Sequence, residues 1–239
     1  ALAALAQAQQ IEPENGAARE LRGEVERVSL DLASAAEREQ RVSEGLILAR
    51  EEYSKRRYEA AISAANGVLA ARDRGLDLLG VIVVAAMTAI GGGTVRDLLL
   101  DRHPIFWLMD PVYLIVIIAA ALATAAYLRA WTPPVGTMRV ADAPGLALFS
   151  LSGAQVAEST QCPPLIVVML GTMTGVTGGV LRDVITAQVP LILRRDLYAT
   201  AANTGVTLYL LLQALGLSRH LAFGAGMFIV GLFELLVEP

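Results

Sequence analysis

The sequence predicts an all-α membrane protein: a polytopic helix bundle of inverted three-helix repeats plus a final helix, preceded by a soluble helical segment. Three observations predict this class. Hydrophobic residues make up 55% of the 239 positions, above the share of about 45–50% that is usual in soluble domains. Charged residues are concentrated before residue 72, and a glycine-arginine motif occurs twice in the apolar remainder.

The predicted soluble segment covers residues 1–71. It holds 12 of the 23 acidic and 9 of the 19 basic residues, and it has no run of about 20 apolar residues that could cross a bilayer. Leu21, Val25, Val28 and Leu32 recur at three- and four-residue spacing, which indicates a helix. Breaks are expected near 13–16 and at Gly45.

Residues 72–239 form the predicted membrane domain. Its apolar stretches run over about 76–100, 111–130, 143–159, 163–186, 196–215 and 221–237. At 1.5 Å per residue, most of them can span a hydrocarbon core of about 30 Å. Six such stretches leave little polar surface for water, so an ordinary soluble protein is excluded.

Arginines in the loops predict the orientation in the inner (plasma) membrane. Arg72, Arg74, Arg129, Arg139, Arg194 and Arg195 fall in loops on one side, whereas Arg102 and Arg219 fall on the other. Because basic loops stay in the cytoplasm, the six-to-two excess predicts a cytoplasmic C-terminus. The N-terminal segment is expected there too, unless a further span precedes residue 72.

The repeated motif relates two halves of the membrane domain. Gly92-Gly93-Thr94-Val95-Arg96-Asp97 recurs 86 residues later as Gly178-Gly179-Val180-Leu181-Arg182-Asp183. An odd number of helices per copy inverts the second copy, as in many transporters. The same offset places Gly153 on Gly67 and Asp142–Ala157 on Arg56–Ala71. That first-copy segment carries charges, however, and its uncharged run is too short to span.

The glycine clusters are the candidate pore and kink positions: Gly91, Gly92, Gly93, Thr94, Gly175, Thr177, Gly178 and Gly179. Glycine lets a helix bend and expose carbonyl groups, which membranes tolerate where they line a wet path. Glycine also permits close helix packing without a pore. Both interpretations stay open, and most of the nearby hydroxyls are expected to bond to their own helix.

The charged gate candidates are Arg96, Asp97, Arg182 and Asp183. An arginine inside the membrane costs at least about 2.5 kcal/mol unless it is paired or hydrated. Adjacent residues of a helix point apart, so pairing across the repeats is the hypothesis: Arg96 with Asp183, and Arg182 with Asp97. The alternative is that both arginines reach opposite membrane interfaces.

Other functions are excluded by composition. The net charge of -4 argues against a nucleic-acid partner. One cysteine and two histidines argue against a metal site built from these side chains. The chain has no catalytic constellation and no Gly-Lys-Ser/Thr phosphate loop, so we predict no enzyme activity, metal or cofactor.

The first motif, Gly91-Gly92-Gly93-Thr94-Val95-Arg96-Asp97, is followed by Pro104-Ile105-Phe106-Trp107. Together they closely resemble the prokaryotic TRIC family of trimeric intracellular cation channels, also known as a glycine-transporter domain. The resemblance covers about 72–239. It implies a homotrimer with a 3+3+1 helix plan and one pore per protomer, between helices kinked at the glycines. The family's first helix is expected to be replaced in this chain.

The segment Tyr53-Ser-Lys-Arg-Arg-Tyr58-Glu-Ala-Ala-Ile62 resembles a tetratricopeptide (TPR) helix pair, and Ile11-Glu-Pro13-Glu-Asn15 is typical of TPR boundaries. This resemblance implies a peptide or protein partner for residues 1–71.

The sequence therefore favours passive conduction of a monovalent cation across the lipid bilayer, with K⁺ first by resemblance. Two alternatives stay open: a secondary transporter for glycine or another small amino acid, and a membrane-anchored TPR-type interaction scaffold.

Overall fold

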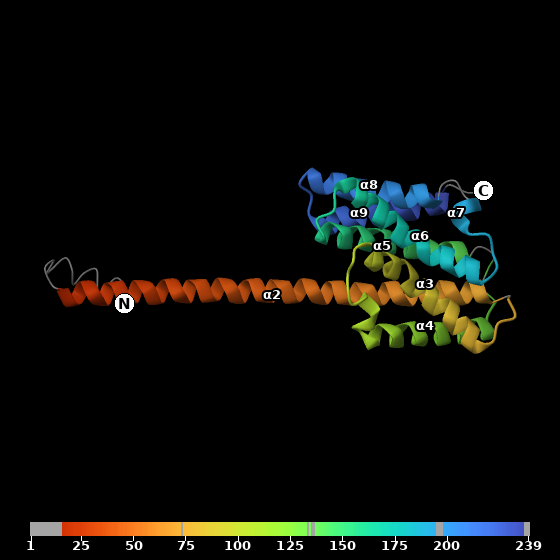
Figure 1. Cartoon of the computed structure of the whole chain (residues 1–239), viewed down its shortest axis with the longest axis horizontal. Helices are drawn as coiled ribbons and strands as arrows, with labels where there is room; N and C mark the ends of the chain where they lie inside the picture. The colour runs from red at the N-terminus through yellow and green to blue at the C-terminus, as the bar shows by residue number, and fades with distance from the viewer. Residues whose placement is uncertain (1–15, 73, 133, 135–136, 195–197, 237–239) are drawn as a thin grey trace. The chain divides into compact units, whose positions relative to one another are not determined.

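The computed structural model describes residues 16–72, 74–132, 134, 137–194 and 198–236. All regular elements in these ranges are helical (Figure 1). They are α2 (Gly16–Ala71), α3 (Leu78–Leu99), the 3-10 turn η1 (Phe106–Leu108), α4 (Pro111–Ala130), α5 (Thr137–Ser159), α6 (Pro164–Ile185), α7 (Leu191–Arg194), α8 (Tyr198–Ala214) and α9 (Arg219–Leu236).

The chain divides into two compact units, 1–54 and 55–239. In the first unit, the described chain is one helix. Apolar side chains such as Val28, Val42 and Leu46 are exposed on it. The helix continues through Gly45, because a glycine costs a helix only about 1 kcal/mol relative to alanine and the neighbouring residues are good helix formers.

The expected TPR-like helix pair is therefore wrong for the described residues. Tyr53–Ile62 lies within α2, which does not turn between Gly16 and Ala71. The predicted boundary motif at residues 11–15 lies outside the described residues.

The second unit begins at Lys55, 17 residues before the boundary that hydropathy predicts at residue 72. Ala60, Ala64, Gly67 and Val68 of α2 are buried in this unit. Small residues add little to a hydropathy window, yet they allow close helix packing. The segment 55–71 thus occupies the place of a first helix, although its composition does not resemble a membrane span.

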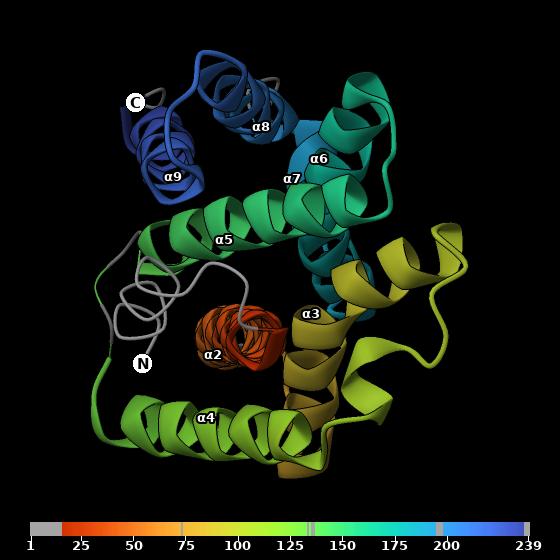
Figure 2. The same ribbon diagram turned by 90° about the vertical axis from the view of Figure 1, so that its left-hand side faces the viewer.

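Two helix groups build this unit, each with its own core. Segment 55–71, α3 and α4 meet around Ala64, Ala85 and Ile117. Helices α5, α6, α8 and α9 meet in two adjoining clusters that include Leu151, Val206 and Val230. In Figure 2, α8 and α9 lie beyond α5 as seen from α4. This arrangement is the expected plan of three helices, three helices and a final helix.

The helix contacts repeat with the sequence offset. A Cβ on Gly67 of α2 would lie 2.9 Å from the hydroxyl of Thr88, and a Cβ on Gly153 of α5 would lie 2.6 Å from that of Thr174. Gly153 and Thr174 each lie 86 positions after Gly67 and Thr88, so the two contacts are equivalent by the repeat. The two repeats therefore pack their first and second helices in the same way.

Helix lengths follow the predicted stretches closely. Asp77 and Asp110 cap α3 and α4, accepting bonds from Gly80 N at 2.7 Å and Val112 N at 3.0 Å. Among the described helices, α3, α4 and α6 are long and apolar enough to cross a membrane by length and composition. Helices α5, α8 and α9 match the other expected stretches, but they do not reach the length and hydropathy that identify the three spans.

Candidate functional site

The repeated glycines lie where α3 crosses α6. A Cβ on Gly178 would lie 2.5 Å from the carbonyl oxygen of Thr88, and one on Gly92 would overlap that of Thr174. These two contacts are again related by the 86-residue offset. Both helices are continuous through their clusters, so Gly92 and Gly178 serve close backbone packing, the second of the two interpretations.

The other candidate positions divide between packing and helix-bonded hydroxyls. A Cβ on Gly91 would overlap the side chain of Leu181, and a Cβ on Gly175 would overlap that of Ser150. A Cβ on Gly93 would lie 2.5 Å from the ring of Phe106. Thr94 and Thr177 donate to carbonyl oxygens of their own helices, at 2.7 and 2.6 Å. The expectation that such hydroxyls bond to their own helix is confirmed for these two.

The expected exchange of partners between the repeats is wrong. Arg96 donates from Nε and Nη2 to Asp97 Oδ1 at 2.9 and 2.7 Å, and Arg182 donates from Nε to Asp183 Oδ1 at 2.9 Å. Both arginines are buried within the bundle, 7% and 0% exposed.

Each aspartate also fixes the chain that follows its helix. Asp97 Oδ2 accepts the backbone N–H of Phe106 at 3.1 Å, and Asp183 Oδ2 accepts that of Leu191 at 3.0 Å. In both repeats the carboxylate thus joins the end of the glycine-bearing helix to the next element. The Arg-Asp motif is a paired structural clamp at each helix end.

The repeats differ in what else the arginine binds. Arg182 Nη1 also donates to Asp142 Oδ1 of α5, and Asp142 Oδ2 accepts the hydroxyl of Tyr198 at 2.8 Å. Two carboxylates thus contact one guanidinium, which leaves the cluster a formal charge of −1. The position equivalent to Asp142 in the first repeat, 86 residues earlier, is Arg56. The first repeat therefore has no carboxylate there and lacks this cluster.

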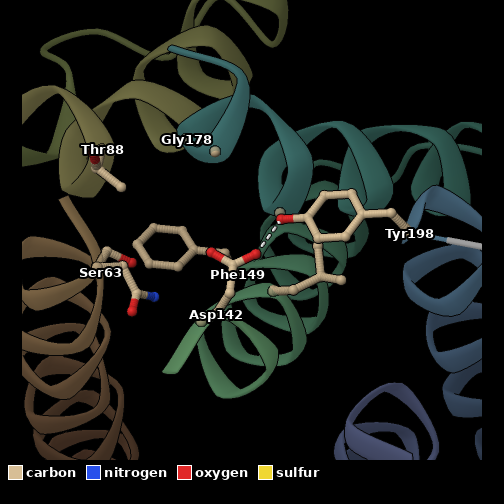
Figure 3. A pocket seen from close by; sticks show the side chains of 11 residues that line it. Ser63, Thr88, Asp142, Phe149, Gly178 and Tyr198 are labelled. Atoms are coloured by element: carbon tan, nitrogen blue, oxygen red, sulfur yellow. Dashed lines mark hydrogen bonds between the residues drawn. The ribbon is translucent and has the colours of Figure 1, made fainter. Parts of the chain in front are cut away.

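A small cavity of about 20 Å³ adjoins the Arg182–Asp142–Tyr198 cluster. This volume exceeds the roughly 10–15 Å³ that one water molecule needs. Figure 3 shows Ser63 and Thr88 on one side and Tyr198 on the other, with Phe149 and Asp142 between them. The remaining lining residues are Asn66, Gly145, Leu146, Gly175, Gly178 and Gly179. Second-copy candidate glycines therefore line this cavity, whereas Gly91–Gly93 do not.

The cavity belongs to a polar seam between the first helices of the two repeats. On α2 the seam residues are Lys55, Glu59, Ser63 and Asn66, and on α5 they are Asp142, Gly145, Phe149, Ser152 and Gln155. Both sets follow the three- and four-residue spacing that places side chains on one helix face. Lys55 Nζ donates to Gln155 Oε1 at 2.9 Å, and Asn66 Nδ2 donates to Ala141 O at 2.9 Å. The two helices therefore run antiparallel along the seam.

Polar groups in the seam are buried, and some lack partners. Glu59 is 4% exposed, and its Oε1 accepts no hydrogen bond from the described residues. It lies near the charges of Lys55 and Arg96 and within hydrogen-bond reach of Ser152. Asn66 is 2% exposed, and its Oδ1 is likewise without a partner in the described chain. Such groups are costly in a dry interior, which indicates a hydrated seam.

Sequence reasoning missed the seam and the Asp142–Tyr198 contact. One signal was present: Asp142 is a carboxylate at the start of an apolar stretch, and ionisable residues in membrane segments pair with one another. Among the described residues, no three His, Cys, Asp or Glu side chains gather as metal ligands.

Comparisons with known proteins agree with this architecture. A family model described as "Glycine transporter" matches residues 60–129 and 139–214. This match begins inside α2, so it includes most of the segment expected to replace the family's first helix. UPF0126 inner membrane protein YadS of Escherichia coli K12 is 42% identical over 146 residues, covering 61% of this chain and 70% of that protein. A UPF0126 membrane protein of Vibrio cholerae is 38% identical over 176 residues, 72% of each chain.

Two solved structures share the fold. The TRIC trimeric intracellular cation channel orthologue from Rhodobacter sphaeroides has a TM-score of 0.73 and 34% identity, covering 77% of this chain and 94% of that one. A structure from work on conductance through TRIC cation channels has a TM-score of 0.69 and 36% identity, covering 77% and 90%. The covered share of 77% equals the length of the second unit, residues 55–239.

Proposed function

The chain belongs to the family described as Glycine transporter, and from this premise we propose that it conducts monovalent cations passively across the membrane, with K⁺ as the main ion. The path runs along the seam between α2 and α5 in each protomer. Two solved relatives are titled as cation channels, and one of them as trimeric, which supports conduction and a homotrimer.

The observation that carries this proposal is the row of buried polar groups along the seam. Glu59, Ser63, Asn66 and Asp142 are all less than a tenth exposed. In hydrocarbon, such groups are retained where they line a water-filled or ion-filled path. The formal charge of −1 on the Arg182 cluster favours cations over anions at that end of the seam.

Phe149 divides this path. Its ring lines the cavity and is 7% exposed, with Asp142 and Asn66 on one side along the helices and Ser152 and Glu59 on the other. An apolar side chain between two polar regions forms a constriction that can exclude water. In this proposal the path is closed at Phe149.

Glycine transport, which the family's name suggests, is the alternative function. The volume of the cavity beside Asp142 corresponds to one or two water molecules, which is less room than a zwitterion of five heavy atoms needs. The size of the site therefore favours an ion. Glycine uptake that saturates and competes with K⁺ flux would instead support the transporter.

The seam also bears on orientation. Lys55 contacts α5 near its C-terminal end and Asn66 contacts it near its start, so segment 55–71 crosses the bundle. With the arginine-rich loops in the cytoplasm, the C-terminus is cytoplasmic and the chain enters the bundle at Lys55 from the opposite face. The sequence predicts a cytoplasmic N-terminal segment only if no span precedes residue 72. In this proposal segment 55–71 is such a span, so the N-terminal segment lies on the side away from the cytoplasm.

Flux in liposomes tests the function. Purified protein should carry K⁺ down its gradient without any other substrate, as measured with an entrapped fluorescent indicator. Gly145→Val should lower this flux toward that of empty liposomes, because a Cβ at Gly145 would already lie 3.2 Å from Asn66 Nδ2 in the seam. Gly231→Val is the matched control, since nothing lies within 4 Å of a Cβ there. Equal flux from the two variants would exclude this path.

A further inference from the structure

The helix of the first unit has a repeat of seven residues. With Val25 at position a, apolar residues fill ten of the eleven a and d positions within residues 18–53, which we call the heptad face. The exception is Glu39, and the large apolar members are Leu21, Val25, Val28, Leu32, Val42 and Leu46. At b, c and f, by contrast, eight of fifteen residues are charged. Heptads sustained over this length are typical of a coiled coil.

The described side chains of the heptad face lie open. Val28, Val42 and Leu46 are 53%, 62% and 66% exposed, and the described part of the first unit is one helix. A helix gains most of its stability by packing an apolar face against another element. A periodic helix much longer than 25 residues is typical of coiled coils, and α2 runs over 56 residues. We therefore expect partner helices on this face.

We propose that residues 18–53 form a parallel, in-register coiled coil with the same segment of two further copies of this chain. The matched family region begins at residue 60, so this contact lies outside it. Copies that insert into one membrane by the same signals share one orientation. Because α2 continues from residue 54 to residue 55 without a break, the segments of all copies lie on one side of the membrane and run parallel.

The size and charges of the heptad face fit further copies of the same segment. Positions a, d, e and g number 21 within residues 18–53, which falls in the range of about 20–30 residues on each side of a stable interface. In a parallel coil, each residue at g faces the residue at e five positions later on its neighbour. Within residues 18–53, every charged residue of these pairs faces Ser, Ala or Gly. No like charges meet beside the core.

The core residues indicate the number of strands. Leu32 and Leu46 are at a, and the β-branched Val28 and Val42 are at d. Leucine at a with a β-branched residue at d shifts the preference from two strands to three or four. The pair at the N-terminal end, Leu21 and Val25, has the opposite order. Three strands rather than four follow from the homotrimer proposed above, so the strand number rests on that proposal and the coil itself does not.

Cysteine cross-linking of the full chain in native membranes tests the coil. In a Cys162→Ala background, Val42→Cys places a thiol at d, and Glu44→Cys places one at f, on the other side of the helix. Both positions are exposed in the single chain. Thiols at d of neighbouring strands approach disulfide geometry, with Cβ atoms about 3.5–4.5 Å apart. Mild oxidation should therefore give covalent dimers for Val42→Cys, and at least about fivefold fewer for Glu44→Cys, because f faces away from the core.

Leu46→Glu and Ile47→Glu distinguish the coil from chance collisions. Both parent side chains are apolar and exposed, 66% and 59%, but residue 46 is at a and residue 47 is at b. Combined with Val42→Cys, Leu46→Glu should abolish the dimers, because like charges would meet in one layer of the core, and Ile47→Glu should keep them. Equal yields at residues 42 and 44, no dimers at residue 42, or no effect of Leu46→Glu would overturn the coil. Absence of dimers at residue 42 would leave the heptad face to a different protein.

Val28→Cys combined with Val42→Cys tests the strand number. Each disulfide joins two chains, so two layers of the coil can link three chains. Covalent trimers would support three strands, whereas dimers alone, or covalent tetramers, would overturn that number. The coil and the channel also fail separately. Cross-linking specific to residue 42 in protein without K⁺ flux would keep the coil and reject the channel, and flux in protein with equal yields at residues 42 and 44 would do the opposite.

Discussion

The crossing of α3 and α6 yields a prediction with a magnitude. Gly178→Ala adds one methyl group, and its carbon would lie 2.5 Å from the Thr88 carbonyl oxygen. Because favourable contacts between heavy atoms lie near 3.5 Å, the facing backbones must separate by roughly 1 Å. That oxygen belongs to the main chain, so no side-chain rotation can relieve the overlap.

Gly224→Ala supplies the reference. It makes the same substitution within helix α9, and nothing lies within 4 Å of the added carbon. Both variants gain the helix preference of alanine over glycine, about 1 kcal/mol, so this gain cancels between them. The remaining difference is the cost of overpacking, about 1–3 kcal/mol.

For a domain of this size, each kcal/mol shifts the unfolding midpoint by roughly 2–4 °C. We therefore expect Gly178→Ala to unfold about 2–12 °C below Gly224→Ala in detergent, as followed by circular dichroism. Gly92→Ala should behave like Gly178→Ala, since it overlaps the symmetry-related Thr174 carbonyl. Coincident midpoints for Gly178→Ala and Gly224→Ala would refute the close approach of the two helices.

Two further predictions address the charge cluster and the topology. Asp142→Asn should lower stability by about 3 kcal/mol, since it removes a buried partner of Arg182. Asp101→Asn, whose side chain is 98% exposed, should stay within about 0.5 kcal/mol of the parent in the same thermal melt. In a Cys162→Ala background, a membrane-impermeant maleimide should label Arg50→Cys on intact cells, but Arg74→Cys only after permeabilisation. The reverse pattern would invert the proposed orientation.

Much of the site was within reach of the sequence. The 86-residue offset related Gly92 to Gly178 and Gly67 to Gly153, and the structure places both pairs in equivalent helix contacts. The hydrophobic stretches predicted α3, α4 and α6 to within a few residues. Such features follow from local composition and spacing, which a single chain displays directly.

The partners of charged side chains were not within reach. Pairing Arg96 with Asp183 follows from the rule that neighbouring residues on a helix point apart, but in the structure Arg96 donates to the adjacent Asp97. Hydropathy does not predict a span over residues 56–71, because Arg56, Arg57 and Glu59 make the segment polar. Its buried face nevertheless packs through Ala60, Ala64 and Gly67, and hydropathy does not weigh the fit of small residues.

By itself, the sequence determined that this protein is a helical membrane bundle made of two related halves, because apolar length and a repeated motif are local properties. Only the tertiary structure decided that α2 supplies the first helix, that Asp142 and Tyr198 join Arg182, and that Asn66 faces a cavity beside them. These facts depend on which helix faces meet across the repeats, and the packing of side chains distant in sequence sets those faces.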